Sequence, residues 1–527
     1  MTQTAPTHDP SHDPSVDEML YTWITTFGAD SADAAYLLAD RHDPTAVAFT
    51  TIDVDGDELV TVDLTYGELA DASKRFAAAL ADLGVGRGDR VGVLMGKRAE
   101  LVVSLLAIAR LGAVYVPLFT AFAAPAIEMR LTAGDARVVI TEPGQADKLD
   151  GIDGITTIVA GDEFDGLVAA HDPVTESVAV GGDGMLILLF TSGTTGAPKG
   201  VPVPVRALAA FSCYMHYGLD VAADDVFWNA ADPGWAYGLY YGILGPMAVG
   251  RRNLLLHAGF SPAVTAQVLR ELSVTNFAAA PTVYRSLSKD PSFTGFTLRR
   301  ASSAGEPLTP DVIDWAREAL QTEVRDHYGQ TEHGMFINNH WHPDVARPLV
   351  PGSMGSPMPG FATGIVDGQI AIEVAQSPLL FFTGYLDAPD KTAARFTPDG
   401  AWYLTGDTGR KDDDGRYYFT ARDDDVIIMA GYRIGPFDVE SVLITHPSVV
   451  DVAVVGRPDD LRGEVLEAFV VLAEGVDGTD ALETELQQLV KTGFAAHAYP
   501  RTVHFVDALP KTPSGKIQRF ILRKQES

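Results

Sequence analysis

Apolar runs and amphipathic stretches alternate along the first four-fifths of the chain. Arg90 to Met95 has the continuous apolar character of a buried strand, Glu100 to Leu111 predicts a helix, and Ala113 to Leu118 predicts the next strand. A further buried strand is expected at Met185 to Phe190, directly before a loop of Gly, Thr and Ser. Strands that alternate with helices in this way predict a layered α/β fold.

The pattern changes after Arg422, where three aspartates precede the apolar run Val426 to Ala430. The rest of the chain predicts short helices and strands near Val439 to Ile444, Val452 to Val455, Ala468 to Leu472 and Leu482 to Phe494. We therefore predict an α/β protein with a large N-terminal domain of layered sheets and helices at 17–423 and a small, mobile α+β C-terminal domain at 424–527. Residues 1–16, polar and rich in His, Asp, Pro and Thr, are predicted to form a flexible tail.

Composition narrows the class of protein. A chain of 527 residues is too long for one ordinary core, which agrees with two domains. It has no run of about 18 uninterrupted apolar residues, so no membrane span is expected. Met1 to Val16 lacks the basic start and apolar stretch of a signal peptide, so we expect a cytoplasmic protein.

The charge balance and the cysteine count exclude further classes. A net charge of -31 repels a phosphate backbone, which argues against nucleic acid as the main partner. The acidity fits either a salty cytoplasm or a device for solubility. The single cysteine, Cys213, excludes a disulfide within the chain and argues against a cysteine-based metal site.

The strongest local signal is the loop Thr191 to Gly200, TSGTTGAPKG, which follows a predicted buried strand. Its small residues let the backbone approach an anion, its hydroxyls and amides can donate to phosphate oxygens, and Lys199 adds positive charge. The spacing of a Walker A loop, G-x-x-x-x-G-K-[ST], is absent. A phosphate-binding loop and a flexible surface loop both fit this composition.

With the strand before it, this segment reads LLFTSGTTGAPKGV. It resembles the phosphate-loop signature of the adenylate-forming superfamily, which includes acyl-CoA synthetases, adenylation domains of non-ribosomal peptide synthetases and beetle luciferases. Further segments resemble other motifs of this superfamily, in its order and over nearly the whole chain. The resemblance implies an enzyme that uses ATP and Mg²⁺. In this first segment the implied nucleotide contacts are Thr191, Ser192, Gly193, Thr194, Thr195 and Lys199.

Two shorter segments resemble the parts of this superfamily that contact adenine and ribose. Ser303 to Leu308, SAGEPL, resembles the adenine loop, which implies nucleotide contacts from Gly305, Glu306 and Pro307. Alone it would be an ordinary turn. Tyr403 to Asp407, YLTGD, resembles the motif whose final aspartate binds both ribose hydroxyls, and a carboxylate suits that role because it accepts two hydrogen bonds at once.

Asp326 to Glu332, DHYGQTE, resembles the adenylate-binding motif of the superfamily. The resemblance implies that Tyr328 stacks on adenine, Thr331 donates to the α-phosphate and Glu332 coordinates Mg²⁺. Asp326 and Gln330 complete the nucleotide contacts that it implies. A lone Thr-Glu pair more often marks a helix N-terminus, so this interpretation depends on the surrounding motifs.

Positions near the predicted domain boundary resemble the nucleotide-contacting junction, the hinge and the CoA tunnel of the superfamily. Arg422 resembles an arginine on the ribose and phosphate side of the domain junction, and Asp424 resembles the hinge. Gly431 and Tyr432 resemble the segment that lines the CoA tunnel, where a glycine lets the pantetheine arm pass closely. Arg433 in the same segment would meet phosphate.

Pro510 to Ile517, PKTPSGKI, resembles the loop of the catalytic lysine, which is Lys516 here. The implied reaction is in-line attack of a carboxylate on the α-phosphorus of ATP, with Lys516 bridging the carboxylate and the α-phosphate as pyrophosphate leaves. Rotation about the hinge would then withdraw the lysine and admit CoA to the same site. The loop also resembles sites that protein acetyltransferases modify, and acetylation would remove the charge of Lys516.

Two positions bear on the acid. Trp235 lies in DPGWAYG, which resembles the segment contributing to the acyl pocket of acetyl- and medium-chain acyl-CoA synthetases. Acetate-specific members carry Trp directly before Gln-Thr-Glu, where this chain has Gly329, and the missing indole leaves space for a larger acyl group. We expect a short-branched or medium-chain acid over acetate. Tyr240, Tyr241 and Tyr284 could narrow or polarise the pocket, which leaves hydroxylated and aromatic acids open.

The expected function is therefore an AMP-forming acyl-CoA ligase that takes ATP, Mg²⁺, CoA and a small carboxylic acid. A stand-alone adenylation enzyme that loads a carrier protein shares every nucleotide motif, and an acetyl-CoA synthetase is a further alternative. No carrier domain with a Ser-bearing attachment motif follows Ser527, which favours the CoA ligase. A scaffold that kept only the fold is disfavoured by the joint presence of Lys199, Glu332, Asp407, Arg422 and Lys516.

Overall fold

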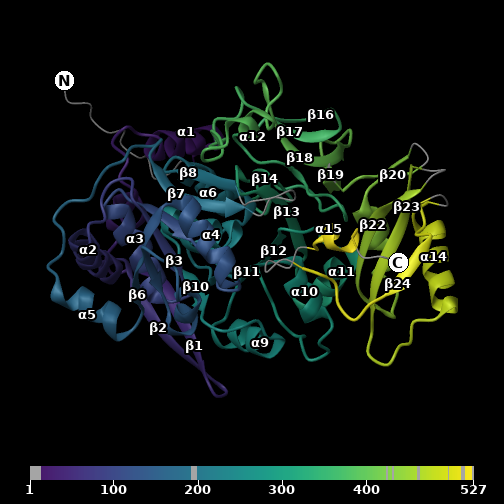
Figure 1. The fold of residues 1–527 in the computed structure, drawn as a ribbon, viewed down its shortest axis with the longest axis horizontal. Helices are drawn as coiled ribbons and strands as arrows, with labels where there is room; N and C mark the ends of the chain where they lie inside the picture. Colours follow the sequence, from purple (N-terminus) through teal and green to yellow (C-terminus); the bar gives the residue numbers. More distant parts are fainter. Residues whose placement is uncertain are drawn as a thin grey trace.

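The computed structural model describes residues 14–191, 199–422, 425–429, 432–459, 463–495, 498–511 and 517–524. This part of the chain forms four sheets, of nine, six, four and five strands. Figure 1 places the five-stranded sheet, drawn in yellow and yellow-green, at one end of the molecule beside a larger body of sheets and helices. The predicted fold class, a large α/β domain followed by a small C-terminal domain, is confirmed.

The nine-stranded sheet draws its strands from two separate parts of the chain, 47–65 and 227–357. Its strands are β1 Val47–Asp55, β2 Glu58–Thr65, β9 Phe227–Asn229, β10 Asn253–Leu256, β11 Asn276–Ala279, β12 Arg300–Ala304, β13 Val324–Gln330, β14 Gly334–Asn338 and β15 Ser356–Pro357. They run in the order β15-β14-β13-β12-β11-β9-β10-β1-β2. The inner strands are parallel, and antiparallel pairs close both edges.

The six-stranded sheet includes three of the strands expected from the hydrophobic pattern. Its strands are β3 Arg90–Leu94, β4 Val114–Pro117, β5 Ala136–Thr141, β6 Thr156–Val159, β7 Met185–Thr191 and β8 Lys199–Pro204, in the order β6-β5-β3-β4-β7-β8. β3 to β7 are parallel, so their carboxyl ends share one edge. β7 delivers the chain to the phosphate-loop segment at that edge, and antiparallel β8 takes it away.

Helices pack against these two sheets. They are α1 Val16–Phe27, α2 Tyr66–Asp82, α3 Ala99–Arg110, α4 Ala124–Gly134, α5 Asp162–Ala170, α6 Ala207–Cys213, α7 Ala236–Gly238, α8 Gly245–Val249, α9 Pro262–Glu271, α10 Pro281–Ser288 and α11 Pro310–Ala319, with the short segments η1 Tyr36–Asp40, η2 Pro143–Leu149, η3 Tyr214–Gly218 and η4 Leu239–Leu244. The expected helix at 100–111 is α3, whose side chains from Leu101 to Arg110 are all buried, as its apolar character on every face predicts. α1 begins at Val16, the last residue of the predicted tail, because Ser15 and Glu18 form a capping box.

The remaining two sheets lie on either side of the predicted boundary. The four-stranded sheet contains β16 Thr363–Val366, β17 Gln369–Glu373, β18 Trp402–Lys411 and β19 Tyr417–Arg422, with α12 Pro389–Ala393 before β18. The five-stranded sheet contains β20 Ile427–Met429, β21 Tyr432–Ile434, β22 Val449–Asp459, β23 Gly463–Leu472 and β24 Thr502–Phe505, with α13 Pro436–Leu443, α14 Asp480–Gly493 and α15 Arg519–Leu522.

The C-terminal part buries a core of its own. One cluster of buried side chains there, including Val439, Val454, Leu466 and Leu486, draws all its members from Ile427 onward. A separate core is the mark of a domain. The chain passes from β19 to this domain between Arg422 and Asp425, and Asp425 pairs with Arg523 beyond α15 at 2.6 Å. The predicted hinge, Asp424, lies outside the described residues.

Candidate active site

Parallel pairing of β12 and β13 brings two of the predicted motifs together. Ala304, the last residue of β12, lies opposite His327 of β13, so the segments that leave the two strands emerge at the same edge of the sheet. Gly305 to Pro307 follow β12, and Thr331 and Glu332 follow β13. Ligands of open α/β sheets bind at such carboxyl edges.

Asp407 on β18 is the centre of the predicted ribose site. It is 4% exposed, and its Oδ2 accepts hydrogen bonds from the Tyr328 hydroxyl and the Gln330 amide, each at 2.6 Å. Arg422 lies opposite it on β19, with a guanidinium nitrogen 3.9 Å from Oδ1. Two donors therefore fix the carboxylate through one oxygen, while the other faces a cation and can still accept hydrogen bonds from a ligand.

Glu332 is supported by two residues that the motif analysis did not identify. The Tyr385 hydroxyl donates to Glu332 Oε1 at 2.8 Å, and Arg395 Nε donates to the Tyr385 oxygen at 3.1 Å. The Tyr385 proton is committed to the carboxylate, because an ionised carboxylate can only accept. Arg395 also donates to the Thr405 carbonyl at 3.0 Å, which joins this support to the ribose motif.

Positive charge collects around Glu332 in a protein whose net charge is -31. The Lys199 ammonium lies 4.9 Å from the centre of the Tyr385 ring. Partial burial lowers the pKa of Lys199, and the charges of Arg395, Lys391 and Arg422 lower it further while Glu332 raises it. Cations held this close together repel one another, and a bound polyanion would relieve that repulsion. The cluster is therefore suited to binding a polyanion.

A Mg²⁺ ion fits this arrangement when phosphate groups share its coordination. Glu332 is 7% exposed and holds one oxygen against Tyr385. Within the described ranges no cluster of three His, Cys, Asp or Glu side chains that could hold a metal is found. A single well-placed carboxylate with substrate phosphates and water is the usual protein environment for Mg²⁺.

The residues predicted to lie near adenine also have defined conformations and contacts in the structure. Gly305 has a φ of +104° with open space around the position of a Cβ, so the backbone there can lie close to a ligand. Glu306 pairs with Arg285 of α10 at 2.9 Å. Asp326 keeps part of its surface exposed, but the surrounding protein atoms raise its pKa to about 8. The backbone amide of Leu308, the last residue of the adenine loop, donates to its Oδ2 at 3.5 Å.

The tyrosines that could have polarised the acyl pocket bind backbone groups instead. Tyr240 donates to the Thr331 carbonyl at 3.0 Å, and Tyr241 accepts from the Met335 amide at 2.7 Å. Tyr284 is fully buried and donates to the carbonyls of two neighbouring strands. Tyr240 and Tyr241 thus brace the turn that carries Thr331 and Glu332 from behind.

The two predicted acyl-pocket residues differ in their surroundings. Trp235 is partly exposed and meets Phe119 edge to face, with ring centres 6.1 Å apart. Gly329 lies at a bulge between β13 and β14. A Cβ there would overlap the carbonyl oxygen of Gly334 and lie 2.7 Å from the Met335 Cα. A side chain therefore fits at 329 only if the backbone of β14 moves, and the assignment of Gly329 to the acyl pocket stays a prediction.

Several predicted residues fall beyond what the structure describes. Ser192, Gly193, Thr194 and Thr195 of the phosphate loop, Asp424, Gly431 and Lys516 lie outside the described residues. Thr191 and Lys199 lie opposite each other at the ends of β7 and β8, which frame the phosphate loop. The backbone of Tyr432 and Arg433 forms part of β21, paired with β20.

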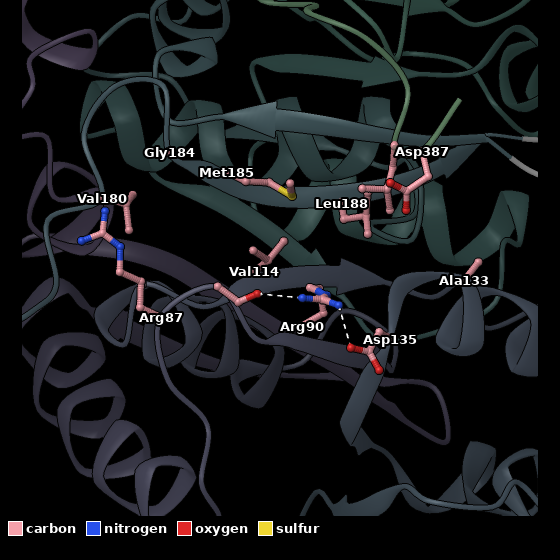
Figure 2. Close-up of a pocket in the computed structure, with 13 residues that line it drawn as sticks. Arg87, Arg90, Val114, Ala133, Asp135, Val180, Gly184, Met185, Leu188 and Asp387 are labelled. Atoms are coloured by element: carbon pink, nitrogen blue, oxygen red, sulfur yellow. Dashed lines mark hydrogen bonds and ion pairs between the residues drawn. The ribbon is translucent and has the colours of Figure 1, made fainter. Parts of the chain in front are cut away.

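A cavity of about 330 Å³ lies away from these motifs (Figure 2). Arg90, Val114 and Met185 line it, and each is the first residue of a parallel strand. The cavity therefore lies at the amino edge of the six-stranded sheet, opposite the phosphate-loop edge. Figure 2 shows Arg90 bound to Asp135 on its wall. No residue predicted to bind nucleotide lines it, so the candidate active site remains at the carboxyl edges of the sheets.

The layered fold and the meeting of these motifs define an adenylate-forming enzyme. The family model for AMP-binding enzymes matches residues 39–375, and the model for their C-terminal domain matches 438–516. The chain belongs to the AMP-binding enzyme family, which confirms the superfamily predicted from the motifs. No helix within the described ranges combines the length and apolarity that a membrane crossing requires.

Relatives cover nearly the whole chain. An acetyl-coenzyme A synthetase of Bacillus subtilis is 35% identical over 94% of this chain and 90% of its own length. A crystal structure of a Brucella canis acyl-CoA synthetase is 42% identical, covers 96% of both chains and has a TM-score of 0.74. MatB from Rhodopseudomonas palustris is 27% identical over 94% of this chain and 98% of its own, with TM-scores of 0.83 for the ATP-bound and 0.73 for the apo structure.

Proposed function

We propose that this protein is an AMP-forming carboxylate–CoA ligase, which converts a small carboxylic acid into its acyl-adenylate and then into the acyl-CoA. The observation that carries the proposal is the convergence of four separate segments. Asp407 binds Tyr328 and Gln330, and Glu332 in the next turn is linked through Tyr385 to Lys199 at the end of the phosphate loop. Each segment supplies the chemistry that one part of ATP needs.

In the first half-reaction the carboxylate of the acid attacks the α-phosphorus and pyrophosphate leaves. Asp407 would hold the ribose hydroxyls and Thr331 would donate to the α-phosphate. Glu332 would hold Mg²⁺, which neutralises charge on the phosphates. Lys199 and Arg395 bring positive charge to the side where pyrophosphate departs, and Lys516 would bridge the attacking carboxylate and the α-phosphate.

In the second half-reaction the thiol of CoA attacks the acyl carbonyl and AMP leaves. The C-terminal domain has its own core and joins the large domain through a short charged segment, which suits rotation about Asp424. Gly431 and Tyr432 would then line the path of CoA, with Arg433 near phosphate.

We propose a short-branched or medium-chain acid as the substrate. Gly329 stands where acetate-specific members carry tryptophan, and Trp235 would border the acyl group. Acetate is the second candidate, favoured by the Bacillus subtilis relative. Loading of a carrier protein in place of CoA is the third.

The experiment is a product analysis with a panel of acids. Purified protein is incubated with ATP, Mg²⁺ and each acid from acetate to decanoate, including branched, hydroxylated and aromatic acids, with and without CoA. We expect AMP, pyrophosphate and acyl-CoA in equal amounts, with multiple turnovers only when CoA is present. Formation of ADP, or no release of AMP and pyrophosphate with any acid, would refute the proposed ligase activity. Turnover with a phosphopantetheine-bearing carrier but not with CoA would establish the carrier alternative.

Reversible acetylation of Lys516 and a cytoplasmic location, where ATP and CoA are supplied, are further parts of the proposal. Acetylation would replace the ammonium by a neutral amide and stop the first half-reaction, which would spare ATP and CoA. Mass spectrometry of the protein from its native host is the test. Persistent absence of acetyl-Lys516, while other acyl-CoA synthetases of that host are acetylated, would contradict it.

A further inference from the structure

The cavity at the amino edge of the six-stranded sheet combines apolar walls with charged side chains (Figure 2). Val114 and Leu188, whose side chains are buried, and the partly exposed Met185 belong to the apolar part. The volume of about 330 Å³ lies at the lower end of the range found for sites of small organic ligands, about 300–1,000 Å³. The space therefore suits a small molecule with an apolar body.

The two arginines of the lining differ in their partners. Arg90 is bound into the wall, because its guanidinium donates to two backbone carbonyls and, at 2.9 Å, to the Asp135 carboxylate. Arg87 pairs with no carboxylate of the described residues, and Figure 2 shows it on the side of the cavity away from Asp135 and Asp387. In a chain with 39 basic and 70 acidic residues, an arginine without such a partner is a candidate for binding an anion.

The acidic residues of the lining limit what the cavity can hold. Asp135 and Asp387 both line it, and among the described residues no cation pairs with Asp387. A ligand with one anionic group can place that group at Arg87 and its apolar part along the walls. A second anionic group at its other end would meet the two carboxylates and be repelled. These charges favour a monocarboxylate over a dicarboxylate or a nucleotide.

Two lining residues connect the cavity with the phosphate-loop edge. The Leu386 amide donates to the Gly200 carbonyl at 2.8 Å, and a Cβ at Gly200 would lie 3.2 Å from the Leu386 Cβ and 3.1 Å from the Leu188 Cδ1. Gly200 directly follows Lys199, and Leu386 directly follows Tyr385, over whose ring the Lys199 ammonium lies. A ligand that packs against Leu188 and Leu386 therefore contacts the neighbours of the Lys199–Tyr385 pair.

We propose that this cavity is a second ligand site, which binds a small aliphatic monocarboxylate and couples its occupancy to nucleotide binding through Gly200 and Leu386. Arg87 holds the carboxylate through its planar guanidinium. The packing around Gly200 is close, so a displacement on the cavity side is transmitted to the Lys199 side. The coupling goes beyond the proposed function and requires only that the protein binds ATP.

The site is tested with octanoate as the probe and the Met185 methyl group as the reporter. The full-length protein carries ¹³C-labelled methionine methyl groups, and Met185→Leu identifies the Met185 resonance among those of the eleven methionines. We expect octanoate to shift this resonance saturably. Arg87→Glu should weaken the octanoate affinity at least about tenfold, because a charge-assisted hydrogen bond is lost and a like charge is added.

The matched control is Arg137→Glu, which makes the same charge change at a side chain that is 79% exposed and outside the lining. Its octanoate affinity should stay close to that of the wild-type protein. Ala133→Trp, which adds an indole at an exposed position of the lining, should block binding in a folded protein. An unshifted Met185 resonance, or equal octanoate affinities of Arg87→Glu and Arg137→Glu, would overturn the site.

The assignment to a monocarboxylate is tested with suberate, which has the same number of carbon atoms as octanoate and a carboxylate at each end. Suberate should bind at least about tenfold more weakly, because its second carboxylate meets Asp135 and Asp387. Suberate binding that is as tight as octanoate binding would overturn this assignment.

The coupling is tested by repeating the Met185 titration with Mg²⁺ and α,β-methylene-ATP, an analogue that cannot be cleaved to AMP and pyrophosphate. Because coupling between two ligands is reciprocal, the bound analogue should change the dissociation constant of octanoate, by at least about fivefold. An unchanged constant with the analogue bound would overturn the coupling alone. If the analogue does not bind, the coupling and the proposed function both fail, while the titration without nucleotide still decides whether the cavity binds a carboxylate.

Discussion

The predicted nucleotide side and the predicted acyl side of the candidate active site are built differently. On the nucleotide side, polar side chains from different segments bind one another: Asp407 is held by Tyr328 and Gln330, and Glu332 by Tyr385. On the acyl side, hydroxyls bind backbone, as Tyr240 does at the Thr331 carbonyl. The first arrangement defines charges and directions for one ligand. The second defines mainly a shape.

This difference explains why sequence motifs predict the reaction but do not predict which carboxylic acid is the substrate. ATP requires particular groups at fixed places, so its residues recur in recognisable motifs. An acyl chain requires only space, and space depends on backbone detail such as the bulge at Gly329. Substitutions on each side can therefore distinguish a preorganised nucleotide side from a sterically determined acyl side.

Among variants of the residues that the structure describes, the largest effect is expected for Asp407→Ala. The change removes the ribose acceptor and leaves Tyr328 and Gln330 without their shared partner. Hydrogen bonds to a charged group are worth about 1.5–3 kcal/mol each, so kcat/KM for ATP should fall by at least about a hundredfold. Asp399→Ala, in an exposed turn bonded to Thr397, is the control. Equal kcat/KM in both variants would show that Asp407 does not bind the nucleotide.

Gly329→Ala should destabilise the protein, since its Cβ would overlap the backbone of β14. Overpacking of this kind costs about 1–3 kcal/mol, so Tm should fall by several degrees. Gly144→Ala is the control, because its Cβ meets open space. Gly329→Trp should reduce folded protein rather than simply raise the preference for acetate. A Gly329→Trp enzyme with unchanged Tm and a higher acetate ratio of kcat/KM would restore the simple pocket-filling account.

Tyr385→Phe should weaken metal binding while the fold stays intact. Loss of the hydroxyl frees Glu332 Oε1 from its donor, and supports of metal ligands are typically worth tenfold or more. We expect the Mn²⁺ affinity of the ATP complex, measured by electron paramagnetic resonance, to fall about tenfold. Tyr418→Phe, whose hydroxyl bonds Asp412, should leave it unchanged. Unaltered Mn²⁺ affinity of the Tyr385→Phe variant would show that Tyr385 does not support metal binding by Glu332.

Asp326→Asn should produce the smallest effect, on the pH dependence of stability. Burial raises the pKa of Asp326 to about 8, above its value of about 3.9 in an unfolded chain. Between these values the unfolded state has lost the proton and the folded state keeps it, so this group destabilises the fold increasingly as pH rises. The Tm of Asp326→Asn relative to wild type should therefore rise from pH 5 to pH 8. A constant difference would contradict the raised pKa.

Much of the framework could be predicted from sequence because its signals are local. The strands expected at 90–95 and 113–118 appear as β3 and β4 within a residue or two, and the helix expected at 100–111 appears as α3. The capping box of Ser15 and Glu18, which starts α1 at the end of the predicted tail, is also a local sequence signal. The polar composition of residues 1–16 nevertheless favoured the prediction of a tail.

The supporting residues of the site could not be predicted in the same way. Tyr385 and Arg395 lie more than fifty residues beyond Glu332, outside the motifs, and only the fold brings them to it. The direction of a Cβ at Gly329 depends on a bulge in the pairing of β13 and β14, which leaves no mark in the residue pattern. Contacts that depend on register and on distant segments require coordinates.

The most direct test of the central claim, that one site catalyses two half-reactions with a lysine needed only for the first, is Lys516→Ala. Adenylate formation is measured as pyrophosphate release in a single turnover, and thioester formation is measured from synthetic acyl-AMP and CoA. The account predicts that the first is abolished and the second is retained. Equal loss of both half-reactions, or an unchanged first half-reaction, would contradict it.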